Sequence, residues 1–134
     1  PELLAELHGN IAKLRCESCE TTTHKSLDLK RCLHCGGTLV SSVVNFGQSL
    51  PRKDLESSYY HSNKSDLFVV AGSSLVVTPA AYMPREALRT GAKLVIINEG
   101  ETPFDSVCHL RFNEKTGDVL PQAVSELKRL MGIT

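Results

Sequence analysis

The chain has 134 residues, of which 41% are hydrophobic, enough apolar material for one modest core. Its 15 basic and 15 acidic side chains give a formal net charge of zero, without the basic excess that nucleic-acid-binding proteins usually carry. No apolar run approaches the roughly 20 residues that a membrane-spanning helix needs. We therefore expect a globular protein that binds neither nucleic acid directly nor a membrane.

Four of the five cysteines form two Cys-x-x-Cys pairs, Cys16/Cys19 and Cys32/Cys35, with twelve residues between the pairs. Each pair lets two thiolates converge on one point, and together they provide the four sulfur ligands that a tetrahedral Zn²⁺ prefers. Such a closed site predicts a structural zinc. Two disulfides, an iron–sulfur cluster and a redox dithiol are the alternatives, which the paired spacing favours less. The fifth cysteine, Cys108, is expected to be a buried apolar residue of a strand.

After the second cysteine pair, the sequence changes to strand and helix signals. Residues 38–46 are rich in β-branched side chains and predict extended chain, and Pro51 then opens a helical stretch. Residues 66–71 form a short continuous apolar run. Such a run is typical of a strand that is buried on both faces of a parallel sheet.

The second half of the chain continues the alternation of helix and strand. A helix over residues 80–90 and a second buried strand over residues 93–98 complete a βαβ unit. Residues 107–112 predict one more strand. Residues 118–131 predict a final helix, with an acidic first turn and basic residues near its end. We therefore expect a parallel sheet with helical crossovers.

Polar residues follow both predicted parallel strands: Gly72, Ser73 and Ser74 follow the first, and Asn98 and Glu99 the second. Ligands of such sheets bind outside the carboxyl ends of the strands. The glycine permits close backbone approach, the serine hydroxyls suit phosphate oxygens, and the asparagine suits ribose hydroxyls. The alternative is that these residues form only turns and a helix cap.

Several motifs resemble those of the sirtuin family of NAD-dependent protein deacylases, and they occur in the same order and at similar spacing. They are His8-Gly9-Asn10, the four cysteines, residues 43–51, residues 72–81 and residues 91–98. The resemblance implies an α/β fold, a partial Rossmann-like parallel sheet with an inserted small four-cysteine zinc-ribbon module. It divides the chain into residues 1–15 with the catalytic histidine, residues 16–40 with the zinc, and residues 41–134, the C-terminal part of the NAD-binding domain.

The resemblance also implies the reaction, in which the acyl group of an acyl-lysine protein or peptide passes to ADP-ribose and nicotinamide is released. His8 would be the general base that helps to deprotonate a ribose hydroxyl, a task that suits an imidazole near neutral pH. The carbonyl of Val44 would accept the acyl-lysine N–H, and Phe46 would pack along the lysine stem. The alternatives are a loop histidine at position 8 and core residues at positions 44 and 46.

Further roles are implied by position in the family motifs. Substrate-binding positions are Val44, Phe46, Gly47, Gln48, Leu75, Val76 and Val77, in two segments between which an extended peptide would add as a strand. NAD-binding positions are Gly72, Ser73, Ser74, Asn98, Glu99, Asp118 and Val119. The cofactors implied are therefore NAD and a structural Zn²⁺.

The sequence departs from the family pattern in several respects. The N-terminal half is missing, with its Gly-Ala-Gly phosphate loop and Gln-Asn-x-Asp segment, while Gln48 replaces a common Glu and Ser73 a frequent Thr. We therefore expect the chain alone to be inactive or weakly active, with apolar edges that favour self-association. The rival hypothesis is a zinc-ribbon interaction module without enzymatic activity. Unoxidised, metal-type cysteines favour a reducing compartment, the cytoplasm, or the nucleus of a eukaryote.

Overall fold

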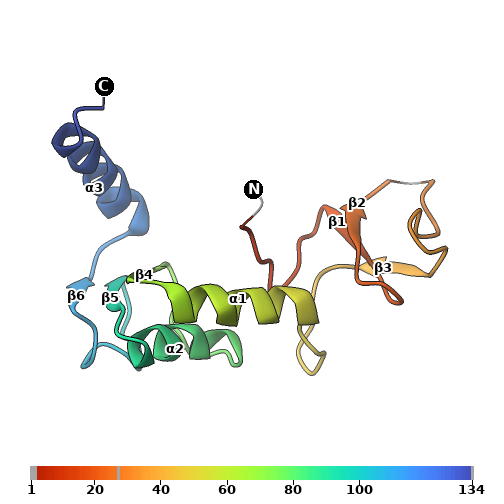
Figure 1. The fold of residues 1–134 in the computed structure, drawn as a ribbon, viewed down its shortest axis with the longest axis horizontal. Coiled ribbons are helices and arrows are strands. Elements are labelled where there is room, and N and C mark those ends of the chain that lie inside the picture. Colours follow the sequence, from red (N-terminus) through yellow and green to blue (C-terminus); the bar gives the residue numbers. More distant parts are fainter. Residues whose placement is uncertain (1–2, 27, 134) are drawn as a thin grey trace. The chain divides into compact units, whose positions relative to one another are not determined.

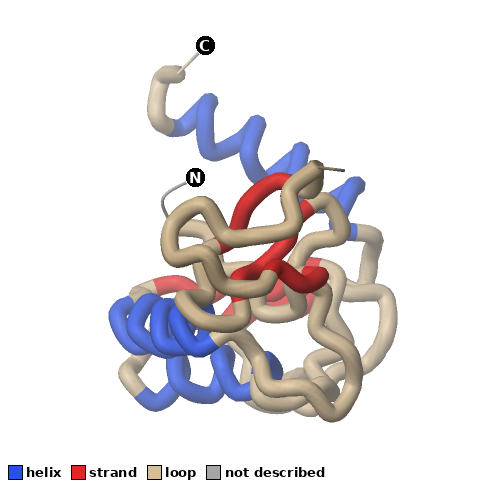
Figure 2. The backbone as a smooth tube through the Cα atoms, turned by 90° about the vertical axis from the view of Figure 1, so that its right-hand side faces the viewer, coloured by secondary structure: helices blue, strands red, loops and turns tan. Residues whose placement is uncertain are grey.

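The computed structural model describes residues 3–26 and 28–133. Its contacts divide the chain into two compact units, Pro1–Ser58 and Tyr59–Thr134. Figures 1 and 2 show the helices, strands and loops of both units. Within the described residues, no helix is both long enough and apolar enough to cross a membrane.

The first unit contains a small antiparallel sheet in the order β2-β1-β3. Its strands are β1 (Lys13–Cys16), β2 (Thr22–His24) and β3 (Leu39–Ser41). The central strand, β1, pairs with β2 through Lys13 and His24, and with β3 through Cys16 and Leu39. Strand β1 includes residues on both sides of position 15/16, and β3 includes residues on both sides of position 40/41. These are the positions at which the family resemblance divides the chain.

The extended segment predicted over residues 38–46 is shorter in the structure, where pairing ends at Ser41. The hydroxyl of Ser42 accepts a hydrogen bond from the Asn10 amide at 3.0 Å and donates one to the Asn10 carbonyl at 2.7 Å. Residues 43–50 are then loop and turn, with Gly47 at a φ of +83°. The side-chain bonds of Ser42 to another segment therefore take the place of a continued strand ladder.

Helix α1 (Arg52–Lys64) begins directly after Pro51, as predicted, and crosses from the first unit into the second. The second unit contains a parallel sheet in the order β4-β5-β6. Its strands are β4 (Leu67–Ala71), β5 (Lys93–Ile97) and β6 (Leu110–Phe112). The parallel pairing of β4 with β5 confirms the predicted βαβ unit.

The crossover between β4 and β5 consists of the 3₁₀ turn η1 (Ala80–Tyr82) and helix α2 (Met83–Arg89). The glycine predicted to close this helix, Gly91, has a φ of +95°, which suits a residue without a Cβ atom. Helix α3 (Thr116–Leu130) continues from β6, and none of its residues is buried.

The core of the second unit lies on one face of its sheet. Val70, Leu94, Ile96 and Phe104 form a buried cluster. Partly buried apolar residues pack against this cluster: Phe68, Leu75, Leu88 and Cys108. The buried apolar role predicted for Cys108 is thus confirmed in part, although the residue precedes β6 and does not belong to a strand.

The prediction that residues 66–71 are buried on both faces is wrong. Successive side chains of a strand point to opposite faces. In β4, Val70 is only 6% exposed, whereas Leu67 and Val69 are 57% and 45% exposed. Val69 pairs with Val95, which pairs with Leu110, itself 56% exposed, so this row of apolar side chains marks the open face.

The strand predicted over residues 107–112 begins only at Leu110. The amides of Val107 and Cys108 both donate hydrogen bonds to the carbonyl of Phe104, at 3.0 and 2.9 Å. These bonds wind the chain into a turn before the ladder starts. The apolar residues therefore predicted a strand in this segment correctly, but the predicted strand was longer than the observed one.

Candidate functional site

The four paired cysteines converge in the first unit. Their Sγ atoms all lie within 4.8 Å of one another, with Cys16 and Cys35 at 3.4 Å and Cys19 and Cys32 at 3.7 Å. Tetrahedral zinc at about 2.3 Å from each sulfur would place the sulfurs about 3.8 Å apart, whereas a disulfide bond measures about 2.05 Å. All four cysteines are free. The cluster therefore fits a tetrahedral metal site and not two disulfides.

Tight turns on both sides bring the thiols together. The amide of Glu20 donates to the Cys16 carbonyl at 3.0 Å, and that of Gly36 donates to the Cys32 carbonyl at 2.8 Å. A Cβ atom on Gly37 would lie 2.9 Å from the Sγ of Cys16, too close for any larger residue. Two of the ligands, Cys16 and Cys32, are buried, so the cluster is the interior of this module.

The local hydrogen bonds act differently on the individual thiols. Bonding with the side chain and the amide of Thr21 lowers the pKa of Cys19 to about 6, and the amide of Cys19 lowers the pKa of Cys16. The amide of Gly37 lowers the pKa of Cys35, but the neighbouring thiols Cys19 and Cys16 outweigh it and raise this pKa to about 12. A bound Zn²⁺ would hold all four groups as thiolates, so its binding releases protons.

The His8 loop and the segment around Val44 lie side by side in the same unit. The amide of Val44 donates to the carbonyl of His8 at 3.0 Å. Gly9 has a φ of +76°, and a Cβ atom there would lie 1.8 Å from the carbonyl oxygen of Ser42. Only glycine permits this close approach of residue 9 to the Ser42 carbonyl. The side chain of His8, next to it, is exposed.

Residues 44–48 form a turn with an exposed aromatic side chain. Phe46 is 96% exposed, which contradicts its alternative interpretation as a core residue, while Val44 is half-buried. The amide of Asn45 donates to the side-chain carbonyl of Gln48 at 2.8 Å. Gly47 has a positive φ and lies within the turn. The segment thus presents an apolar side chain beside the His8 loop.

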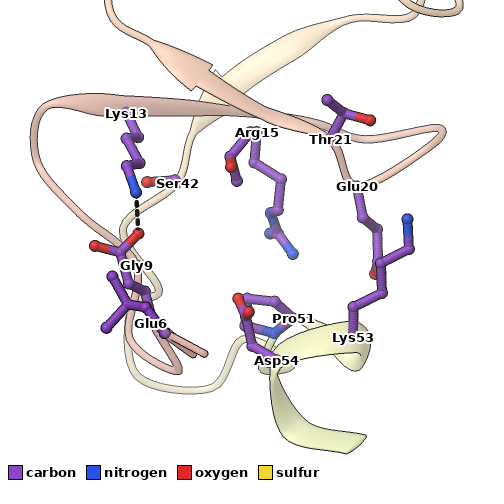
Figure 3. Close-up of a pocket in the computed structure, with 12 residues that line it drawn as sticks. Glu6, Gly9, Lys13, Arg15, Glu20, Thr21, Ser42, Pro51, Lys53 and Asp54 are labelled. Carbon is purple, nitrogen blue, oxygen red and sulfur yellow. Dashed lines mark hydrogen bonds and ion pairs between the residues drawn. The ribbon is translucent and has the colours of Figure 1, made fainter. Parts of the chain in front are cut away.

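A polar cavity of about 360 Å³ lies in the first unit. Its side chains come from the His8 loop, β1, the turn before β2 and the start of α1. In Figure 3, Arg15 projects from β1 into the middle of this cavity. The Nε atom of Arg15 is buried and has no hydrogen-bond partner among the described residues. Beside it, Lys13 and Glu6 form an ion pair at 2.5 Å.

In the second unit, the structure brings the polar ends of β4 and β5 together. The amide of Gly72 donates to the carbonyl of Ile97 at 2.9 Å, and the amide of Asn98 donates to the carbonyl of Phe112 at 3.0 Å. Ser73, Ser74 and Glu99 are exposed next to these bonds. The predicted nucleotide-binding residues of both strands therefore lie at one edge of the sheet.

The start of α3 lies at the same edge. A Cβ atom on Gly72, whose φ is +64°, would lie 3.5 Å from the Oγ1 atom of Thr116. Asp118 and Val119 lie in the first turn of α3, and their amides already donate to the carbonyl of Lys115, at 2.9 and 3.2 Å. The earlier amides of this turn suit an anionic ligand. Sequence reasoning missed Thr116. A helix N-terminus predicted two residues earlier would have included it.

An open groove of about 490 Å³ runs along this helix. Its lining includes both α3 positions predicted to bind NAD. The lining residues are Phe112, Glu114, Asp118, Val119, Gln122, Ala123 and Glu126.

The turn-forming alternative also holds at this edge. The hydroxyl of Ser73 accepts a hydrogen bond from the amide of Leu75 at 3.3 Å, and the Nδ2 atom of Asn98 donates to the carbonyl of Gly100 at 2.9 Å. These bonds occupy an acceptor of the serine and a donor of the asparagine. The hydroxyl proton and the Oδ1 atom remain for a ligand, so the two interpretations are compatible.

The second predicted peptide-contacting segment follows the Gly-Ser-Ser turn. Leu75, with a φ of +56°, packs against the core cluster. Val76 and Val77 are 64% and 45% exposed. Their exposure leaves them accessible to a ligand, as the sequence-based assignment requires.

Comparisons with known proteins agree on one family. A family model described as "Sir2 family" matches residues 2–79. The NAD-dependent protein deacetylase of Oceanobacillus iheyensis is 38% identical over 128 residues, which cover 93% of this chain and 54% of that protein. The NAD-dependent protein deacylase 2 of Archaeoglobus fulgidus is 40% identical over 134 residues, covering 93% and 53%. The chain thus spans about half the length of the curated relatives it matches.

Solved structures give the same result. The structure entitled "Sir2-p53 peptide-NAD+" matches with a TM-score of 0.71 and 36% identity, covering 91% of this chain and 54% of that chain. The structure "Sir2 bound to acetylated peptide" matches with a TM-score of 0.70 and 34% identity, covering 97% and 56%.

Proposed function

The chain belongs to the Sir2 family, and from this premise we propose that it serves NAD-dependent protein-lysine deacylation. It would contribute the zinc module, the catalytic histidine and part of the nucleotide fold. NAD, when bound, supplies the ADP-ribose that accepts the acyl group as nicotinamide leaves. Free thiols arranged for a metal also support our placement of the protein in a reducing compartment, the cytoplasm.

The observation that carries this proposal is the shared polar edge of the second unit. The β4 turn at Gly72, the β5 end at Asn98 and the first turn of α3 lie together there. Amides and hydroxyls from this edge, including those of Ser73 and Ser74, can donate to phosphate oxygens. The Oδ1 atom of Asn98 can accept a hydrogen bond from a ribose hydroxyl. These are contacts to the adenosine diphosphate portion of NAD.

The first unit would hold the acyl-lysine and the general base. The bond between the Val44 amide and the His8 carbonyl, at 3.0 Å, ties the proposed peptide-binding segment to the histidine loop. An exposed imidazole can take a proton and pass it to water. The exposed ring of Phe46 can cover the apolar stem of a lysine side chain.

The proposal is tested by fusing the remaining half of a relative's catalytic domain, such as that of Oceanobacillus iheyensis, upstream of this chain. We expect the fusion to release nicotinamide from NAD only when an acetyl-lysine peptide is present, and the chain alone to release almost none. His8→Ala should abolish turnover without changing the zinc content, because His8 is not a metal ligand. The matched control is His61→Ala, an exposed histidine of α1.

Two outcomes would contradict the proposal. Full activity of the fusion with His8→Ala would remove this histidine from the reaction. A folded fusion that binds nucleic acid in a salt-sensitive manner, with no thermal shift on adding NAD, would support the zinc-ribbon interaction module instead.

A further inference from the structure

We propose that Arg111 is a positioning residue of the nucleotide site, because its guanidinium holds the loop that follows β5 in shape. The inference rests on the proposed function, since this loop carries Asn98 and Glu99. Neither the family motifs nor the sequence pattern singled out Arg111.

The guanidinium of Arg111 donates hydrogen bonds to backbone carbonyls of the loop and of its own strand. One nitrogen, Nη1, donates to the carbonyl of Asn98 at 2.7 Å, and the other, Nη2, donates to the carbonyl of Gly100 at 2.6 Å. Nη1 also contacts the carbonyl of Phe112. The loop therefore curves around one planar donor group, which offers several N–H bonds in a fixed geometry.

A second side chain ties the remaining carbonyl of the loop. With its amide nitrogen turned toward the loop, Asn113 donates to the carbonyl of Glu99 at 2.6 Å. Inside the loop, Asn98 itself donates to the carbonyl of Gly100 at 2.9 Å. The three consecutive carbonyls of residues 98–100 are thus all held by side chains.

Asp105 anchors the guanidinium from the opposite side. Its Oδ1 atom accepts from the Nε atom of Arg111 at 2.9 Å, and its carboxylate also accepts from the hydroxyl and the amide of Thr102, at 2.6 and 3.1 Å. The hydroxyl of Thr102 and the guanidinium of Arg111 hold the pKa of Asp105 below its usual range. The side chains of Arg111 and Asp105 are only 21% and 32% exposed, so this pair is partly shielded from water.

The arrangement explains how the loop can have one conformation without secondary structure. The carbonyls of Asn98 and Gly100 accept from the guanidinium and that of Glu99 accepts from Asn113. This leaves the Oδ1 atom of Asn98 and the exposed side chain of Glu99 for a ligand. Without Arg111, the carbonyls would turn to water, and the loop would have to be ordered when a nucleotide binds. Ordering at that moment costs affinity.

The test compares Arg111→Met, Arg111→Lys and Leu88→Ala in the 134-residue chain. Leu88 packs against the core cluster from α2 and makes none of the hydrogen bonds that hold the loop, so its truncation reports the effect of a general loss of stability. The probe is ADP-ribose, titrated well below the unfolding temperature of every variant. The readouts are its Kd and the hydrogen exchange of the Asn98 and Thr102 amides, which donate to the carbonyl of Phe112 and to the carboxylate of Asp105.

We expect Arg111→Met to weaken ADP-ribose binding about tenfold, because the variant loses the gain in affinity that a preorganised loop provides. The variant should also exchange both amides faster. Arg111→Lys should restore part of the affinity, because it keeps the charge but lacks the planar fork. Leu88→Ala should lower the unfolding temperature and leave the Kd unchanged.

Unchanged affinity in Arg111→Met, with wild-type binding intact, would overturn the positioning role while leaving the proposed function in place. An equal loss of affinity in Leu88→Ala would overturn it too, since the effect would then follow stability. No binding of ADP-ribose by the folded wild-type chain would overturn the proposed nucleotide site and this role together. Unchanged amide exchange in Arg111→Met would show that the guanidinium does not hold the loop.

Discussion

The two units of this chain have interiors of different kinds. In the first unit only four described residues are buried, and two of them are the metal-site cysteines Cys16 and Cys32. In the second unit the interior is apolar and is built around Val70, Leu94, Ile96 and Phe104. The difference implies that a bound metal stabilises the fold of the first unit, whereas hydrophobic burial stabilises the fold of the second.

This division follows from the amount of apolar material that each unit can bury. The strands of the first unit have three or four residues each, and its sheet has three strands. Such a small module rarely folds on hydrophobic burial alone and commonly needs a metal or disulfides. The parallel strands of the second unit instead share one continuous cluster with α2.

The largest expected effect is therefore zinc removal. Chelation, or Cys32→Ala, should unfold the first unit, because structural zinc binding contributes on the order of 10 kcal/mol to the folding of such sites. The amide resonances of β1 to β3 should collapse to random-coil positions in an NMR spectrum, while those of β4 to β6 keep their dispersion.

Cys108→Ala is the matched control, since this cysteine lies outside the metal cluster and should leave the zinc content unchanged. Dispersed resonances for β1 to β3 in the zinc-free protein would contradict the idea that the metal acts as the core of the first unit.

The complementary change is Leu94→Ala in the second unit. Leu94 is fully buried, so its truncation leaves a cavity and should cost about 2–5 kcal/mol of unfolding free energy. Denaturant unfolding followed by NMR should show a loss confined to β4 to β6, with one zinc still bound per chain. Leu67→Ala on the same sheet should cost far less, because Leu67 is 57% exposed. Loss of zinc with Leu94→Ala would show that the two units fold as one.

Much of this organisation could be predicted from local sequence. The spacing of Cys16, Cys19, Cys32 and Cys35 was sufficient for the metal site, because ligand geometry is encoded over a few residues. The two parallel strands of the βαβ unit and the position of the Gly72 turn were likewise correct. Side-chain partners brought together from separate segments were not predictable, such as the guanidinium of Arg111 on the loop after β5.

The prediction of which residues are buried failed for a related reason. The apolar run at residues 66–71 indicated a strand correctly, but its composition could not show that Val69 lies on the open face. Exposure depends on which other elements cover a sheet, and that is a property of tertiary structure. The same limit applies to Phe46, whose apolar character is compatible with a core position or with a ligand-facing one.

The smallest expected effect concerns the polar interior of the first unit. The buried Nε atom of Arg15 has no hydrogen-bond partner in the described part of the chain, and the guanidinium projects into the cavity of Figure 3. A buried donor that makes no hydrogen bond costs about 1–3 kcal/mol, so Arg15→Met, which keeps the apolar stem, should be neutral or stabilise the zinc-loaded unit by about 1 kcal/mol. Lys13→Met should instead destabilise it, because Glu6 then loses its ion-pair partner. Chemical denaturation of the zinc-loaded protein measures both. A larger loss for Arg15→Met than for Lys13→Met would mean that Arg15 is bonded in solution, and that the first unit depends on its polar interior as well as on its metal.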